Sequence, residues 1–188
     1  MAKKTIGTEI AKFQYFYPYT VALVGAKAEE RTNFMSCAWH TALSFDPPLF
    51  GVLIAKKRFT HQVITKAKEF TVNFIRSDQA LLSAQYGRKS GFDLVKTEKF
   101  PVKLIPSRII QSPVIGDAYI SFECRLIEIR TYGDHDLFVG EVLAIHEEEN
   151  NFNEQGVLDP QKTLPLLYLG SDFYCTVDPN SLAHVLPD

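Results

Sequence analysis

Small and polar side chains gather in one stretch of strand length, residues 33–40, which reads NFMSCAWH. Asn33, Ser36 and Cys37 are small enough to leave the backbone accessible, so a flat ligand can lie against it and bond to its N–H and C=O groups. Trp39, the sole tryptophan of the chain, closes the stretch. The pattern predicts either a binding site for a flat ring or a plain barrel strand with Trp39 in the core.

A cluster of basic residues follows at a short distance. Lys56, Lys57 and Arg58 come just before a helical pattern, and the hydroxyl of Thr60 can cap that helix. The first N–H groups and the positive dipole end of a helix attract anions, and neighbouring cations strengthen the attraction. The segment therefore predicts a phosphate seat, with a solvated basic turn and an ordinary threonine cap as the alternative.

Other motifs of enzyme chemistry are absent from the sequence. It has no GxSxG elbow, no GxxxxGKS or GxxxxGKT phosphate loop, no HExxH and no EF-hand pattern. Its five histidines are scattered, and its three cysteines lie far apart without a CxxC spacing. We therefore expect no metal site and no disulfide framework.

Composition narrows the class of protein further. The count of 20 Lys plus Arg against 22 Asp plus Glu gives a net charge of -2, hence no global attraction to nucleic acid or to an anionic membrane. No apolar run approaches the roughly 20 residues that a membrane-spanning helix needs. The N-terminal residues 1–15 show no secretory signal. We expect a single cytoplasmic domain over residues 1–188, without a nucleic-acid or membrane partner.

The elements that must position these residues are mostly strands. Two short helices are expected, at 61–69 and at 78–86, the second with Ser77 as its N-cap and Gly87 as its stop. Strands that follow one another with few helices between them favour an antiparallel barrel over a doubly wound parallel sheet. The apolar runs of strand length cover residues 20–25, 34–43, 49–55, 70–75, 118–130 and 137–145.

In one of these strands the alternation of apolar and polar positions shifts by one residue. Apolar residues take alternate positions from Ile120 to Leu126, but Ile127 and Ile129 take the opposite phase. A β-bulge near Leu126 and Ile127 absorbs such a slip and bends the strand, as barrel closure often requires.

Two segments carry a family pattern. The first has Asn33, the small-residue strand ending at Trp39, Ser44-x-x-Pro47-Pro48, an apolar strand, Thr60 opening a helix, and Phe70-x-Val72-Asn73. The other is Gly133-Asp-His135-Asp-Leu-Phe-Val-Gly-Glu141-Val. Together they resemble the flavin reductase-like family of FMN-binding split barrels, which includes flavoredoxins. The segment from Gly133 is similar to the family strand that carries a histidine near the flavin and the nicotinamide.

The resemblance implies a mainly β fold, an antiparallel, Greek-key FMN-binding split β-barrel with a few short helices. The implied cofactor is FMN, with its phosphate near Arg58 and Thr60, its ring against the backbone of residues 33–39 and the loop 85–91 over it. His135 is implied as the candidate catalytic residue, which positions or polarises rather than acting as an obligatory acid. The implied cofactor-binding residues are Asn33, Phe34, Met35, Ser36, Cys37, Ala38, Trp39, Ala55, Lys57, Arg58, Phe59, Thr60 and Ser90.

The function that follows is an NAD(P)H-dependent flavin or ferric reductase. Such an oxidoreductase accepts hydride from NAD(P)H and passes electrons to free flavin, a ferric complex or an unknown partner protein. A non-catalytic FMN-binding protein or electron carrier of the same fold is the alternative, and a small-ligand barrel without flavin follows if the basic turn is only a surface feature. A homodimer is also expected, because the run 137–145 is apolar on both faces and the resemblance places the flavin near a subunit boundary.

Overall fold

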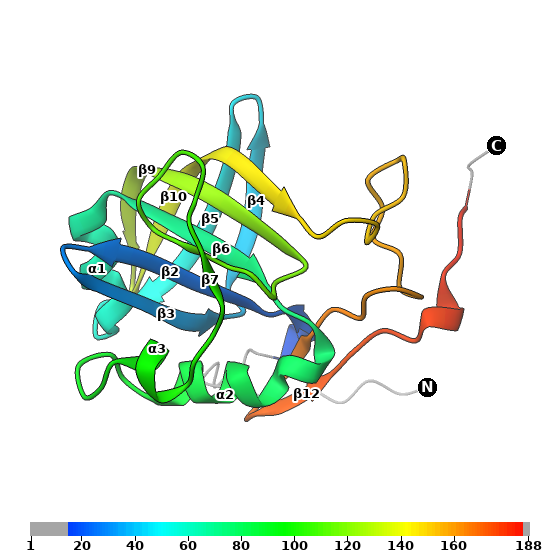
Figure 1. Cartoon of the computed structure of the whole chain (residues 1–188), viewed down its shortest axis with the longest axis horizontal. Helices are drawn as coiled ribbons and strands as arrows, with labels where there is room; N and C mark the ends of the chain where they lie inside the picture. Colours follow the sequence, from blue (N-terminus) through cyan, green and yellow to red (C-terminus); the bar gives the residue numbers. More distant parts are fainter. Residues whose placement is uncertain (1–14, 186–188) are drawn as a thin grey trace.

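The computed structural model describes residues 15–185, so the expectation about a secretory signal lies mostly outside the described residues. Figure 1 shows most of the strands gathered into one curved sheet, with helices below it and at its left edge. In chain order the strands are β1 (Tyr19–Thr20), β2 (Ala22–Ala28), β3 (Arg31–Cys37), β4 (His40–Phe45), β5 (Pro48–Ala55), β6 (Glu69–Phe74), β7 (Leu104–Ile105), β8 (Val114–Ile115), β9 (Ile120–Tyr132), β10 (His135–Glu147), β11 (Leu167–Gly170) and β12 (Phe173–Cys175). The helices are α1 (Phe59–Ala67), η2 (Ser77–Gln79), α2 (Ala80–Arg88), α3 (Lys96–Lys99) and η3 (Pro179–Ser181).

The main sheet has seven strands in the order β3-β2-β6-β9-β10-β5-β4, and every pair in it is antiparallel. The expected run 34–43 is two strands, because the chain leaves the sheet at Ala38 and Trp39 before β4 begins. There the N–H of Leu53 donates to the carbonyl of Trp39 at 2.9 Å, so the end of β3 meets β5 and the sheet curls toward itself. Phe70 and Phe138 fill the interior with no exposed surface.

The predicted bulge is confirmed. Val139 pairs with Glu128 and Gly140 pairs with Leu126, which leaves Ile127 as the extra residue of β9. A further irregularity, opposite Cys124 and Glu123, has no counterpart in the sequence pattern. Both shifts lie in the long β9–β10 pair, where extra residues increase the local bend and twist.

The helices differ in their ends from the expectation. Helix α1 begins at Phe59, its N-cap is Arg58 and no side chain caps it, so the prediction of Thr60 as the cap is wrong. Helix α2 continues through Gly87, and Ser77 belongs to the 3-10 turn before it, so these two end signals are also wrong. None of the described helices is long and apolar enough to span a membrane.

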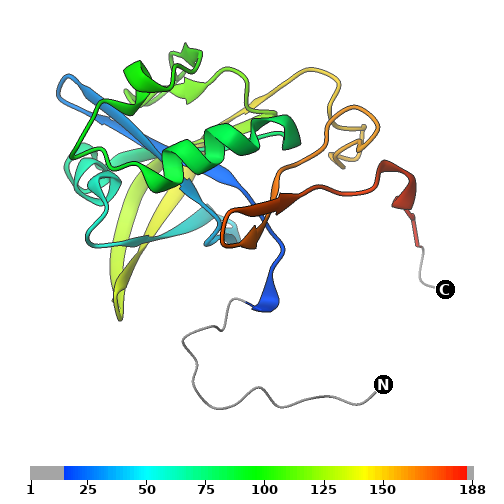
Figure 2. The same ribbon diagram turned by 90° about the horizontal axis from the view of Figure 1, so that it is seen from below.

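Helix α2 lies against β3, as both views of the chain show (Figures 1 and 2). A small antiparallel sheet, β1-β11-β12, contacts this helix through Ser83 and Arg88. Its β11–β12 hairpin was not expected from the sequence. Residues from β2, β3, α2 and the hairpin share a second core, with Leu23, Phe34, Tyr86 and Leu166 almost fully buried. This core packs the helix and the hairpin together with β3.

Candidate functional site

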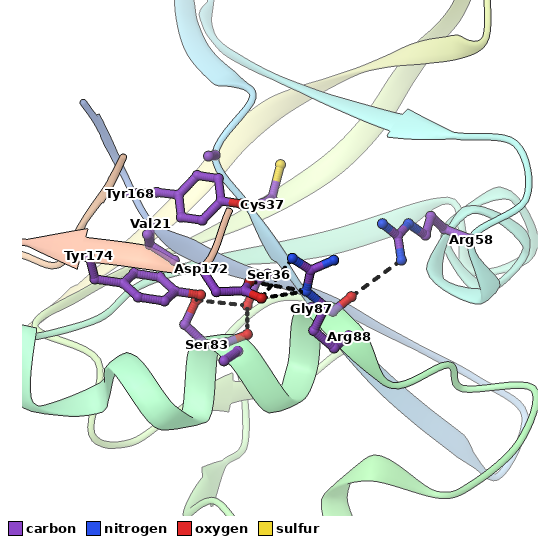
Figure 3. Close-up of a pocket in the computed structure, with 12 residues that line it drawn as sticks. Val21, Ser36, Cys37, Arg58, Ser83, Gly87, Arg88, Tyr168, Asp172 and Tyr174 are labelled. Carbon is purple, nitrogen blue, oxygen red and sulfur yellow. Dashed lines mark hydrogen bonds and ion pairs between the residues drawn. The ribbon is translucent and has the colours of Figure 1, made fainter. Parts of the chain in front are cut away.

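A cavity of about 160 Å³ lies between β3, α2 and the β11–β12 hairpin (Figure 3). We call it the main pocket. The end of strand β3 and the residue that follows it give the pocket a floor of small side chains, α2 gives one wall and the hairpin the other. The lining residues used below are Ser36, Cys37 and Ala38 from β3 and its end, Arg58, then Ser83, Gly87 and Arg88 from α2, and Tyr168, Asp172 and Tyr174 from the hairpin.

The floor of the main pocket is polar but unreactive. Ser36 Oγ donates to the carbonyl of Ser83 at 2.6 Å, and the two hydroxyls are 3.1 Å apart. Burial raises the pKa of the Cys37 thiol to about 12, and a backbone hydrogen bond at Trp39 opposes the shift only in part. Cys37 is therefore a neutral thiol at physiological pH, and its contribution to the pocket is small size rather than nucleophilicity.

A smaller hollow, the recess, adjoins the main pocket at Arg58, which lines both. Three cations, Arg58, Lys89 and Lys96, line it, and none of its lining residues is acidic. The hydroxyl-bearing Thr60 and Ser90 lie there too. A positive hollow with hydroxyl donors suits an anion. The remaining lining residues are Met35, Phe59, Tyr86 and Gly91.

Lys96 is the most unusual residue of the recess. Its side chain is almost fully buried, and Nζ donates to the carbonyls of Phe34 at 3.0 Å and Tyr86 at 2.7 Å. Among residues 15–185 no carboxylate forms an ion pair with it. Burial and, secondly, the charge of Arg58 lower the pKa of Lys96 to about 8. A buried cation without an opposite charge is costly, and a bound anion removes that cost.

The start of α1 forms another side of the recess. Thr60 is buried, and its Oγ1 accepts a hydrogen bond from Asn33 Nδ2 at 2.7 Å, which ties the helix to β3. Arg58 Nη1 donates to the carbonyl of Gly87 at 3.3 Å, across the line where the two cavities meet (Figure 3). The first N–H groups of a helix have no carbonyl inside it to bond, so this end adds donors for an anion.

Trp39 and His135 lie together beyond the end of the main pocket. Their ring centroids are 4.9 Å apart, with an interplanar angle of 40°. Trp39 Nε1 donates to the hydroxyl of Tyr17 at 2.9 Å, and His135 Nδ1 bonds to Asp134 Oδ1 at 2.8 Å. The hydrogen bond and the charge of His135 hold the pKa of the Asp134 carboxyl below its ordinary value. His135 lines neither cavity.

The structure thus brings together most of the residues expected at the site. Ser36, Cys37, Ala38 and Arg58 line the main pocket, and Met35, Arg58, Phe59, Thr60 and Ser90 line the recess. Four others line neither cavity: Asn33 acts through Thr60, the Phe34 side chain is in the second core, Ala55 is buried beside His135, and Lys57 is exposed. Trp39 and His135 form the separate pair described above.

Several residues of the site could not be identified from the sequence. Lys96 stands in a segment without a motif, and its burial depends on α3 packing against β3. Arg88 lies within the loop expected to cover the site, but nothing in the sequence showed its direction. Tyr168, Asp172 and Tyr174 fall in a stretch, LLYLGSDFYC, whose only signal is its density of aromatic residues.

Solved structures with a similar fold include an FMN-binding protein and a flavoredoxin. An FMN-binding protein from Thermus thermophilus, with bound 1-cyclohex-2-enone, is 38% identical, with a TM-score of 0.87 over 98% of this chain and 100% of that one. A flavoredoxin from Methanosarcina acetivorans is 28% identical, with a TM-score of 0.84 over 98% and 95%. A protein with a split barrel domain from Shewanella frigidimarina, 19% identical over 94% of this chain and 90% of that one with a TM-score of 0.82, confirms the split-barrel fold.

Sequence comparison agrees with the shape. An FMN reductase (NADH), SmoA, from Agrobacterium fabrum is 32% identical over 130 residues, which are 68% of this chain and 70% of that protein. The family model of the flavin reductase like domain matches residues 14–176. The expected family is therefore confirmed, and the chain belongs to the family of the flavin reductase like domain.

Proposed function

We propose that this chain is an FMN-dependent oxidoreductase that takes electrons from NAD(P)H. The single observation that carries the proposal is the recess, where three cations and the start of α1 surround a hollow without an acidic residue. The recess opens at Arg58 onto a pocket floored by small residues. A phosphate at one end and a flat ring at the other describe the shape of FMN, and the same features support FMN over a flavin without a phosphate.

The residues present fit that cofactor. The positive charge of Lys96 is buried and has no carboxylate partner among the described residues. A bound phosphate would supply the missing negative charge. Ser36 and Ala38 leave room for the ring to approach the backbone of β3. Tyr168 and Tyr174 from the hairpin keep water from the opposite side of the pocket.

FMN, when bound, supplies the redox chemistry by which a nicotinamide reduces the flavin and an acceptor reoxidises it. The residues of this chain orient the cofactor and enclose it. Arg58, Lys89 and Lys96 bind the phosphate, and Asn33 holds Thr60 in place at the start of α1. We further propose that His135, held by Asp134 and packed on Trp39, positions the nicotinamide at the edge of the pocket.

The electron acceptor of the proposed reaction is free flavin, a ferric complex or a partner protein. The relative named FMN reductase (NADH) supports a reductase with NADH as its donor. The relatives named flavoredoxin and FMN-binding protein support a second candidate function, a non-catalytic FMN-binding protein or electron carrier. Both functions need the same site, and they differ only in reduction by a nicotinamide.

The visible spectrum of the purified protein separates these functions. It is recorded before and after anaerobic addition of NADH or NADPH, in parallel with titration of the flavin-depleted protein by FMN. A reductase binds FMN and bleaches with one of the two donors. Flavin that stays oxidised with both donors supports the carrier, and failure to bind FMN overturns both proposals.

We also propose that the chain forms a homodimer. Phe138 and Val139, which face opposite sides of β10, are both buried within one chain, so this half of the strand needs no partner. Exposed apolar side chains occur at separate places on the β9–β10 pair: Ile145 on β10 is 60% exposed, and Ile127, the bulge residue of β9, is 51% exposed. Phe45, at the tip of the β4–β5 hairpin that projects at the top of Figure 1, is 97% exposed. Sedimentation at micromolar concentration should show a particle of twice the chain's mass, and a stable monomer contradicts the proposal.

A further inference from the structure

An ion pair crosses the mouth of the main pocket. Arg88, the last residue of α2, places Nε 3.0 and 2.8 Å from the two carboxylate oxygens of Asp172 and Nη2 2.7 Å from one of them. Figure 3 shows the two side chains meeting between the helix and the hairpin, beside the floor at Ser36. This fork-like geometry is the strongest form of an Arg–carboxylate contact. The pair therefore joins the two walls of the pocket.

The backbone that carries Asp172 is strained. Gly170, Ser171 and Asp172 have φ values of 100°, 51° and 63°, and the last two are L-residues in the left-handed region. Such a conformation is unfavourable for a residue with a Cβ, and it persists where surrounding contacts hold it. The turn directs the Asp172 carboxylate at Arg88, so the ion pair is a contact that holds the turn.

The hairpin itself has little backbone support. Strands β11 and β12 have four and three residues, and their neighbour β1 has two. Besides the ion pair, Tyr174 is attached to α2 by the hydroxyl of Ser83, which donates to it at 3.2 Å. Short strands with few ladder bonds open at low free-energy cost. Tyr168 and Tyr174 also pack against the second core, and the contacts with α2 add to that packing in holding the tyrosines over the pocket.

We propose that Arg88 and Asp172 are positioning residues that clamp the hairpin 167–175 over the ring half of the bound flavin and so slow its departure. The inference rests on the proposed function, because it needs a flavin in the main pocket. The clamp acts on the ring and not on the phosphate, since Asp172 lines the main pocket but not the recess. Release of FMN and of riboflavin, which lacks the phosphate, must then respond alike.

The test uses the substitution Asp172→Asn. Asparagine tolerates the left-handed conformation at this position, so the turn is kept while the charge is removed. The matched control is Glu141→Gln, which breaks the Arg125–Glu141 pair of 2.6 Å on β9 and β10, away from the pocket. Each protein is loaded with FMN or riboflavin and diluted rapidly, and the recovery of flavin fluorescence gives the release rate constant.

We expect Asp172→Asn to raise the release rate constant about fivefold for both ligands, as loss of an exposed but bidentate ion pair allows. The control should release flavin at the wild-type rate. High salt should accelerate riboflavin release from the wild type and leave riboflavin release from the variant unchanged, because salt screens the pair and riboflavin carries no phosphate. Arg88→Met should reproduce the effect, and the double variant should be no faster than either single one.

The possible outcomes distinguish a failure of the clamp from a failure of the proposed flavin site. If the wild type binds neither FMN nor riboflavin, the proposed function and the clamp both fail. If the wild type binds flavin but Asp172→Asn releases it at the wild-type rate, only the clamp fails. If release of FMN accelerates and that of riboflavin does not, Arg88 acts on the phosphate, and the clamp is again wrong.

Discussion

Glu123 and Lys96 are both buried charges, and they differ in what surrounds them. Glu123 has no exposed surface, and its carboxylate accepts hydrogen bonds from the backbone N–H groups of Arg108, Ile109 and Ile110 and bonds to the ring of His146. Lys96 donates to two backbone carbonyls and forms no ion pair among residues 15–185. A charge whose partners all belong to the chain serves the fold, whereas a charge without a counter-ion is available to a ligand.

The same contrast extends to the segments around the two residues. Glu69 repeats the role of Glu123 one strand away, since its Oε1 accepts from the N–H of Gln111 at 2.8 Å and from the N–H and hydroxyl of Ser112 at 2.7 and 2.9 Å. The two carboxylates thus anchor the loop 107–112. The recess carries cations instead, around a small hollow of about 20 Å³.

The largest expected effect is on the fold, from Glu123→Gln. A glutamine amide turns a donor toward backbone N–H groups that need an acceptor, so at least one of them is left unsatisfied. We expect the free energy of unfolding to fall by about 3 kcal/mol. Urea denaturation measures it, with Glu128→Gln on the exposed face of β9 as the control. FMN affinity should not change, and a variant as stable as the wild type would show that the anchored loop is dispensable.

The pH dependence of stability sharpens this prediction. Burial by itself raises the pKa of Glu123, but the hydrogen bonds from His146 and the three backbone N–H groups outweigh it, and the pKa lies below its ordinary value of 4.5. The carboxylate therefore stabilises the fold fully above the ordinary value, and the contribution is lost as the pH falls through the lowered one. Wild-type stability should decline more steeply in acid than that of Glu123→Gln.

Lys96→Met tests the second of the two buried charges and should weaken ligand binding. Removing the buried cation takes a charge-assisted bond from the phosphate, so we expect FMN affinity to fall about 30-fold. The free energy of unfolding of the flavin-free protein should change little, because the loss of a buried charge without a counter-ion offsets the loss of a donor to the carbonyls of Phe34 and Tyr86. Fluorescence titration measures the affinity. A large loss of stability with unchanged affinity would make Lys96 a residue of the fold, like Glu123.

A pH titration gives an independent test of the same residue. The pKa of Lys96 is lowered to about 8, first by burial and then by the charge of Arg58. Above that value the amine of the flavin-free protein is neutral, so FMN binding should weaken as the pH rises past about 8. Riboflavin binding should not follow this trend, and Lys96→Met should abolish it.

Arg58→Ala should have a smaller effect than Lys96→Met, because Arg58 is exposed and solvent screens its charge. We expect FMN affinity to fall about tenfold and riboflavin affinity to stay constant, since only FMN carries the phosphate. Lys57→Ala is the matched control, because Lys57 is an adjacent cation that lines neither cavity. Equal loss for both ligands would assign Arg58 to the support of the fold.

The sequence allowed the strands, the bulge at Ile127 and most of the β3 and α1 side of the site to be predicted, because these depend on local periodicity and on short segments. Lys96 and Asp172 could not be predicted in the same way. Each reaches the site through contacts between segments distant in the chain, α3 against β3 and the hairpin against α2. The prediction of Thr60 as the cap was wrong because α1 begins at Phe59, which places Thr60 inside the helix, where Asn33 on β3 donates to its hydroxyl.

The smallest expected effect concerns His135, which belongs to neither member of the comparison. Its ring is half-buried against Trp39, it lines no cavity with the cations, and Asp134 holds its Nδ1 at the surface. Hydride transfer needs no proton from a side chain, so His135 can only position the nicotinamide, and His135→Ala should slow flavin reduction about threefold. Stopped-flow reduction under anaerobic conditions measures this rate. FMN content and thermal stability should remain as in the wild type, since the ring of His135 contacts Trp39 and Asp134 and lines neither the main pocket nor the recess. Asp134→Asn is the control, because it weakens the hold on the ring without removing it and should give a smaller decrease.

An unchanged reduction rate in His135→Ala would confine the site to the two cavities, and loss of FMN would make His135 a structural support of Trp39.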